Sequence, residues 1–89
     1  MPARVTLHQN YPNPFNPSTM IRYGLPSRTH VSLVVYNTLG QEVATLVDAT
    51  EEAGFHEIRF DGSGLASGVY FCRLRADDAV RLNRILLLR

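Results

Sequence analysis

The chain has 89 residues, a formal net charge of +1 and 45% hydrophobic residues, which is the profile of one small folded domain. Its single cysteine, Cys72, excludes an intramolecular disulfide, and the absence of lysine excludes Schiff-base chemistry. No apolar run approaches the roughly 20 residues of a membrane-spanning helix. A pI of about 8.0 is too low to favour a nucleic-acid partner.

A proline-rich segment, Tyr11–Thr19, lies near the start of the chain and contains three X-Pro steps, at Pro12, Pro14 and Pro17. Proline fixes its own φ near roughly −65° and disfavours helix at the preceding residue. The segment is therefore predicted to be a stiff loop without helix or strand. Asn13 and Asn16 are expected to form Asx turns, while Tyr11 and Phe15 are expected to hold the loop against a sheet.

Outside this loop the hydrophobic period is two almost throughout, which is typical of strands. Strand patterns cover residues 5–7, 21–25, 31–35, 42–47, 56–60, 70–74 and 80–88. Gln41–Asp48 also fits helical spacing, but it is short and rich in β-branched residues, so a strand is preferred there. The sequence therefore predicts an all-β fold, a seven-stranded immunoglobulin-like β-sandwich.

Two glycines and a tyrosine mark specific turns in this scheme. Gly40 is expected to permit the turn before the fourth strand, and Gly68 the turn into the sixth. Tyr70 is predicted to point inward and to bond a backbone group through its hydroxyl, as in a tyrosine corner. Cys72, two positions later, is interpreted as a small buried hydrophobe, with a reactive thiol as the alternative.

Catalytic and metal-binding patterns are weak along the whole chain. His8, His30 and His56 are widely separated and fit no metal-ligand spacing. The turn at residues 61–64 lacks the alternating carboxylates of a calcium loop. We therefore expect no enzymatic activity, no metal site and no cofactor.

Four ordered motifs carry a resemblance to a known family. They are Asn10–Thr19, Ile21–Pro26, Val35–Val43 and Leu65–Phe71. Together they resemble the type A C-terminal sorting domain of the type IX secretion system over residues 5–89, which leaves residues 1–4 as a linker or remnant. The resemblance implies a non-catalytic immunoglobulin-like domain that directs a larger cargo protein through this system.

The same resemblance implies the partners and the route. The cargo would precede the domain, and a secretory signal would lie on the larger precursor. An outer-membrane translocon would recognise the domain after the precursor has reached the periplasm, and a sortase-like surface peptidase would then remove it. The cargo would finish at the outer membrane and cell surface or outside the cell.

Carried over by position, the recognition region is the last hairpin, Val69–Arg75 and Ala79–Arg89. Its candidate contact residues are Arg73, Arg75, Arg81, Arg84 and Arg89. A basic terminal strand is expected to present side chains and a free edge to a receptor sheet. The alternative interpretation is that the arginines form a solvated face and the strand merely closes the sandwich.

The chain departs from the family pattern at Met20, at Cys72 and in its use of arginine in place of terminal lysines. The first two changes should alter packing only, and the third keeps the charge. A second function also stays open, an immunoglobulin-like accessory module for attachment to a cell surface or to carbohydrate. That role needs a row of exposed aromatic rings, for which Tyr36 and Phe71 are the outward candidates. A free sandwich edge would also allow a weak homodimer.

Overall fold

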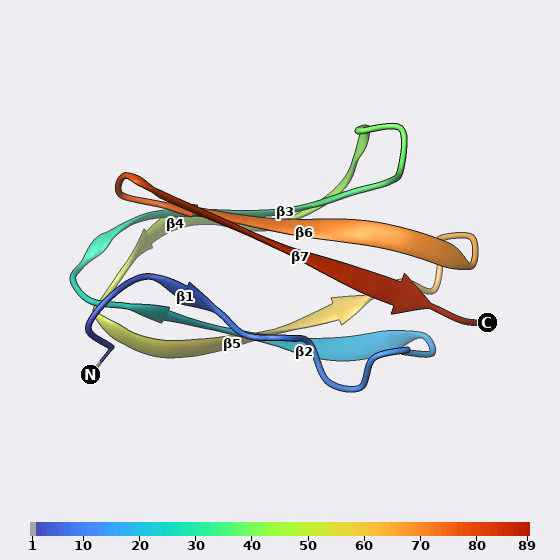
Figure 1. Cartoon of the computed structure of the whole chain (residues 1–89), viewed down its shortest axis with the longest axis horizontal. Helices are drawn as coiled ribbons and strands as arrows, with labels where there is room; N and C mark the ends of the chain where they lie inside the picture. Colours follow the sequence, from blue (N-terminus) through green and yellow to red (C-terminus); the bar gives the residue numbers. More distant parts are fainter. Residues whose placement is uncertain (1) are drawn as a thin grey trace.

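The structure is a computed structural model that describes residues 2–89, in which two antiparallel sheets pack face to face (Figure 1). The strands are β1 (Thr6–Leu7), β2 (Ser18–Leu25), β3 (Thr29–Tyr36), β4 (Glu42–Glu51), β5 (Gly54–Asp61), β6 (Gly68–Ala76) and β7 (Ala79–Leu87). The predicted seven-stranded sandwich is confirmed. No helix capable of crossing a membrane occurs within residues 2–89.

One sheet has three strands in the order β1-β2-β5, and the other has four in the order β4-β3-β6-β7. The fourth strand thus pairs with β3, while the fifth pairs with β2 in the opposite layer. The tight connection between β4 and β5 therefore crosses from one sheet to the other. The two chain ends lie at opposite ends of the long axis (Figure 1).

Several strands are longer than the sequence pattern indicated. β2 begins at Ser18, so Ser18 and Thr19 belong to a strand and the prediction of a strand-free loop up to Thr19 was wrong. The sequence patterns left residues 48–55 between the fourth and fifth strands, whereas the connection is only Glu52 and Ala53, because β4 extends to Glu51 and β5 begins at Gly54. Pairing with a neighbouring strand extends each element beyond its apolar alternation.

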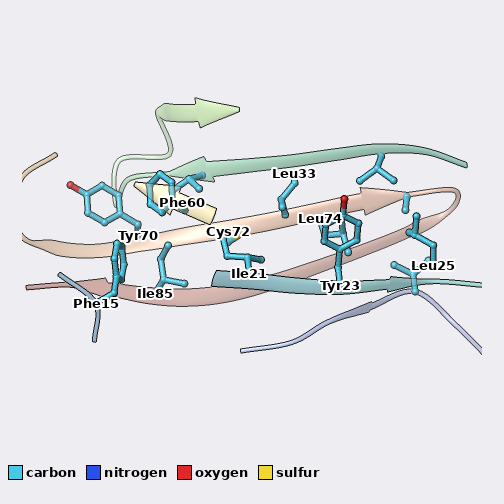
Figure 2. Close-up of a cluster of buried hydrophobic side chains, with 14 of the residues drawn as sticks. Phe15, Ile21, Tyr23, Leu25, Leu33, Phe60, Tyr70, Cys72, Leu74 and Ile85 are labelled. Carbon is cyan, nitrogen blue, oxygen red and sulfur yellow. The ribbon is translucent and has the colours of Figure 1, made fainter. Parts of the chain in front are cut away.

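The core lies between the two sheets and follows the period-two pattern. β2 buries Ile21, Tyr23 and Leu25, each with no more than 1% of its surface exposed. The inward residues of β6 and β7 meet them from the other layer, as the labelled side chains in Figure 2 show. Burying such a side chain stabilises the fold by about 1.5–3 kcal/mol.

Tyr70 forms the predicted tyrosine corner. Its side chain is 7% exposed, and its hydroxyl donates a hydrogen bond of 2.6 Å to the carbonyl oxygen of Ala66, four residues upstream. Gly68, which precedes it, has a φ of +150°. Cys72 lies on the same inward face, and burial raises the pKa of its thiol to about 12. The interpretation of Cys72 as a buried hydrophobe is confirmed.

The proline loop is held by Phe15 rather than by both of its aromatic residues. Phe15 is 1% exposed, and its ring lies 5.8 Å from that of Phe60 (centroid to centroid), whereas Tyr11 is 80% exposed. The expectation that Tyr11 anchors the loop through its ring was wrong. Tyr11 instead contributes backbone hydrogen bonds to Met20, so its ring is free to face solvent.

A buried polar cluster inside the loop was missed by the sequence analysis. Asn10 and Thr19 are 4% and 2% exposed. The Asn10 amide donates to the Thr19 hydroxyl at 3.0 Å and to the Pro12 carbonyl at 3.1 Å, and the Thr19 hydroxyl donates to the same carbonyl at 2.8 Å. These bonds satisfy groups that burial would otherwise leave unpaired.

The loop, the end of β5 and β7 lie close together at Gly62. Its N–H donates to the Pro17 carbonyl at 2.8 Å. A Cβ at this position would lie 3.2 Å from the Leu87 side chain and 3.3 Å from the Phe15 ring, closer than side chains ordinarily pack. A larger residue here would push on the Leu87 side chain and the Phe15 ring, although the composition of the neighbouring residues is that of an exposed turn.

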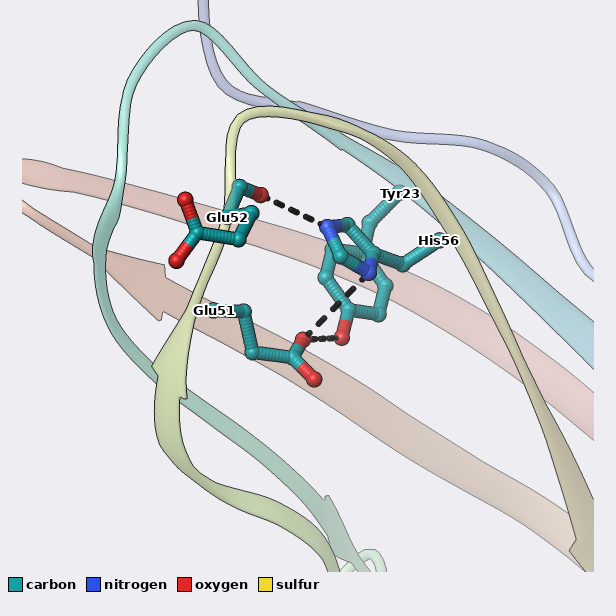
Figure 3. A network of polar contacts seen from close by, with 4 residues as sticks. All are labelled: Tyr23, Glu51, Glu52 and His56. Atoms are coloured by element: carbon teal, nitrogen blue, oxygen red, sulfur yellow. Dashed lines mark hydrogen bonds and ion pairs between the residues drawn. The ribbon is translucent and has the colours of Figure 1, made fainter.

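At the other end of the sandwich, a polar network joins β2 to the β4–β5 connection (Figure 3). The Tyr23 hydroxyl donates to the Glu51 carboxylate, and the His56 ring stacks on Tyr23 with centroids 5.3 Å apart. His56 Nδ1 lies 3.8 Å from the Glu51 carboxylate, and His56 Nε2 lies 2.8 Å from the Glu52 carbonyl oxygen. Burial, followed by the hydrogen bond to Glu51, raises the pKa of Tyr23. The network fixes the place where the chain changes sheets.

The expected linker, residues 1–4, is described only in part, since Met1 lies outside the described residues. Pro2 is buried, and its Cγ lies 2.9 Å from the position that a Cβ on Gly24 would take. Pro2 therefore packs against β2.

Candidate functional site

The five candidate arginines of the last hairpin are divided by strand alternation. Cys72 and Leu74 of β6 are buried, so Arg73 and Arg75 project from the outer face of the four-stranded sheet. Ile85 of β7 is likewise buried, which places its neighbour Arg84 on that outer face too.

Arg81 and Arg89 have different surroundings. Arg81 shares the alternation of the inward residues of β7 but is exposed, and its guanidinium donates to the Val80 carbonyl at 3.1 Å. The Arg89 guanidinium donates to the carbonyls of Ser63 and Leu65 at 2.5 and 2.7 Å. Arg89 therefore ties the end of the chain to the β5–β6 loop.

The outer face of the four-stranded sheet brings Tyr36 and Phe71 together. They are directly opposite one another on β3 and β6, and Arg84 lies opposite Phe71 on β7. In the next row, Arg73 lies opposite Leu82, and its guanidinium carbon sits 4.9 Å from the centre of the Tyr36 ring. The predicted outward orientation of both rings is confirmed by this register.

Residues of this cluster line a hollow in the surface. We call it the Tyr36–Phe71 hollow; its lining residues are Tyr36, Asn37, Thr38, Gly40, Phe71, Arg73 and Leu82. One wall is the β3–β4 turn, in which Gly40 has a φ of +80°, as expected of a turn glycine. The Asn37 side-chain oxygen accepts hydrogen bonds from the N–H groups of Leu39 and Gln41, both at 3.0 Å, so the wall is rigidly built.

The charges on this face are unbalanced. Among residues 2–89, the ion pairs are Arg28 with Glu52, His30 with Asp48 and His56 with Glu51. None of the five candidate arginines takes part in these pairs. Arg73, Arg75 and Arg84 therefore lie on the outer face without an ion-pair partner among residues 2–89, whereas the Arg89 guanidinium is bonded to backbone carbonyls.

The free edge expected on the terminal strand is absent from Arg84 to Leu88, because the proline loop covers it. The Phe15 N–H donates to the Leu86 carbonyl at 2.9 Å, and the Phe15 carbonyl accepts from the Leu88 N–H at 3.0 Å. The Asn13 side chain accepts from the Leu86 N–H at 3.0 Å, which replaces the Asx turn expected at Asn13. Gln9 bonds the Arg84 carbonyl at 3.1 Å.

The remaining residues of the proline motif serve this closure. The carbonyl of Pro12 anchors the Asn10 cluster and that of Pro17 holds Gly62, while Pro14 lies beside Arg84 and Leu86 in a second surface hollow. Sequence reasoning had treated the loop and the last hairpin as separate features. The structure brings them together along β7.

Comparison with known proteins gives a family and a fold. A family model described as a secretion system C-terminal sorting domain matches residues 9–87. Among the curated proteins no sequence matches the chain. Among solved structures, PorZ of Porphyromonas gingivalis superposes with a TM-score of 0.65 at 23% identity.

PorZ is described as an essential bacterial surface component of the type IX secretion system of that organism. The superposition covers 96% of this chain but only 11% of PorZ, so it shows a shared sandwich fold in one part of a much longer protein. The family match extends from the residues before the proline loop to the end of β7. The chain therefore belongs to the family of type IX secretion C-terminal sorting domains.

Proposed function

We propose that this domain is a non-catalytic C-terminal signal that directs a larger cargo protein through the type IX secretion system. The observation that carries the proposal is the family match over residues 9–87, which includes both the proline loop and the terminal strand that it covers. Family membership implies export to the cell surface or the extracellular space. The domain itself takes no part in bond making.

The route that we propose has a periplasmic step followed by recognition at the outer-membrane translocon and removal by a sortase-like surface peptidase. Recognition would use the folded surface, because the proline loop already occupies much of the terminal strand's edge. Arg73, Arg75 and Arg84 are the preferred contact residues, since they share one outer face. Arg81 and Arg89 extend the basic region at its two ends.

A second candidate function is a carbohydrate-associated accessory module. The observation in its favour is that Tyr36 and Phe71 are direct cross-strand neighbours on one exposed face. A stacking platform for a sugar uses adjacent rings of this kind. It also needs several free hydrogen-bonding groups, and Asn37, the one amide lining the hollow, already bonds the β3–β4 turn on both sides.

The test is a reporter enzyme, targeted to the periplasm and fused to residues 2–89, in a host that carries the secretion system. We expect the reporter to reach the cell surface or the medium. The control is the same fusion with Phe15→Ala and Leu87→Ala, which removes the packing of the proline loop on β7. Retention of the unsubstituted fusion in the periplasm would contradict the sorting function, provided that resistance to protease shows the domain to be folded.

A further inference from the structure

The Tyr36–Phe71 hollow combines an apolar floor with uncompensated positive charge. Leu82 at its rim is 60% exposed, and the Arg73 guanidinium lies over the Tyr36 ring. Arg84 borders it beside Phe71. Aromatic side chains next to arginine are enriched at protein interfaces relative to the rest of the protein surface.

The opposite outer face, on the three-stranded sheet, provides an internal comparison. It also has an arginine over an aromatic ring, since the Arg22 guanidinium lies 4.5 Å from the centre of the Phe55 ring. There, however, Glu57 lies directly opposite Arg22 on the neighbouring strand. That face supplies its own carboxylate beside the arginine.

Around the hollow, no carboxylate of the same sheet forms an ion pair with Arg73 or Arg84 within residues 2–89. Glu42 and Asp48 are on β4, and Glu42 lies directly opposite Tyr36, over whose ring the Arg73 guanidinium sits. Both are also engaged locally, Glu42 by the Thr45 hydroxyl at 3.0 Å and Asp48 by His30 at 2.8 Å. Arg73 and Arg84 thus lack a carboxylate partner among the described residues, and a carboxylate from outside would complement them.

The chemistry of the lining decides between a saccharide and a polypeptide. The Asn37 amide is used by the β3–β4 turn, and a neutral sugar bonding the Tyr36 and Thr38 hydroxyls would leave the charges of Arg73 and Arg84 uncompensated. An apolar side chain can pack on Tyr36, Phe71 and Leu82 without hydrogen bonds. Flanking carboxylates would then form charge-assisted hydrogen bonds with the guanidinium groups.

We propose that the Tyr36–Phe71 hollow is a docking site for an acidic protein segment, which places an apolar side chain on Tyr36 and Phe71 and carboxylates on Arg73 and Arg84. This inference rests on the proposed sorting function, because the domain would meet the acidic segment during export. It replaces strand addition at β7, which the proline loop blocks over Arg84–Leu88, with docking onto the sheet face.

The test places a photo-reactive benzophenone amino acid at Leu82 of the reporter fusion and irradiates intact host cells. The matched control carries the same group at Phe55, which is 49% exposed on the opposite face. We expect a protein adduct at Leu82 and not at Phe55. Mass spectrometry of that adduct should map to a segment in which aspartate or glutamate flanks an apolar residue.

Charge dependence is tested with paired substitutions in the same fusion. Arg73→Gln with Arg84→Gln should lower the yield of the Leu82 adduct about tenfold, because each arginine loses a partnered carboxylate. Arg22→Gln with Arg59→Gln on the opposite face should leave the yield unchanged. Equal urea midpoints for the two double variants establish that the fold is retained in both.

Four results would overturn the docking proposal. They are the absence of an adduct at Leu82, an adduct that is a saccharide by periodate sensitivity, an adduct with a second copy of the domain, and a yield that is indifferent to the Arg73 and Arg84 substitutions. Failure of the unsubstituted fusion to be exported would instead count against the sorting function. Loss of the Leu82 adduct with export intact would count against the docking site alone.

Discussion

Replacing Tyr70 with phenylalanine isolates the hydroxyl of the tyrosine corner. The substitution keeps the buried ring and removes only the group that donates to the Ala66 carbonyl at 2.6 Å. Deleting one partner of a buried hydrogen bond generally costs about 1–3 kcal/mol. Ala66 itself is exposed, so water can replace the lost donor on one side. We therefore expect Tyr70→Phe to lower the free energy of unfolding by about 1–1.5 kcal/mol, toward the lower end of that range.

The measurement is urea unfolding at constant pH, followed by thermal melting. For a domain of this size, each kcal/mol shifts the melting temperature by about 4–8 °C, so the expected decrease is about 4–12 °C. Tyr11→Phe is the matched control, because the Tyr11 side chain is 80% exposed and its hydroxyl should contribute almost nothing. An unchanged midpoint for Tyr70→Phe, or equal losses at the two positions, would refute the reasoning.

Three further predictions test other features. Because burial raises the Cys72 thiol pKa from 9.0 to about 12, its stabilising contribution is complete below pH 9 and is lost as the pH rises toward 12. Between pH 8 and 10.5 the parent should therefore lose about 2 kcal/mol more stability than Cys72→Ala in urea titrations, and parallel curves would contradict this. Asn10→Ala should cost about 1–3 kcal/mol in the same assay, because Thr19 and Pro12 lose a buried donor; a neutral result would mean that water takes its place. Arg89→Gln should cost about 1 kcal/mol by releasing the carbonyls of the β5–β6 loop; undiminished stability with impaired reporter export would make Arg89 a recognition residue instead.

The strands and much of the core could be predicted from the sequence because alternation is a local signal. Ile21, Tyr23 and Leu25 alternate with outward residues, and all three are buried. The Tyr70 corner was also predictable, since its partner Ala66 is only four residues away. In each case the information lies within a few neighbouring positions.

The features that could not be predicted depend on partners far along the chain. Asn13 bonds the Leu86 N–H, 73 residues away, and nothing near Asn13 indicates that partner. Gly62 lies in a stretch with the composition of an exposed turn, yet it is buried because Phe15 and Leu87 approach it. The same long-range closure removed the free edge expected on β7.

The residues of the candidate site could be predicted, but their grouping could not, because it depends on pairing between strands. Alternation along the sixth strand indicates that Arg73 and Arg75 face outward, but a single strand carries no information about its neighbours. The pairing of Tyr36 with Phe71 depends on the β3–β6 register, which joins residues 35 positions apart. Sequence reasoning therefore named the two rings without seeing that they form one surface.

The proline loop is hydrogen-bonded to the final strand, so segments from the two ends of the domain are needed to close the sandwich. A chain emerging from the ribosome or threaded through a pore cannot close this sandwich until its last residues are present, because Phe15 has no strand to bond before then. Truncation at either end should therefore leave an open, aggregation-prone molecule rather than a smaller stable one. The sandwich is therefore complete as a folded object only after its final strand has been made.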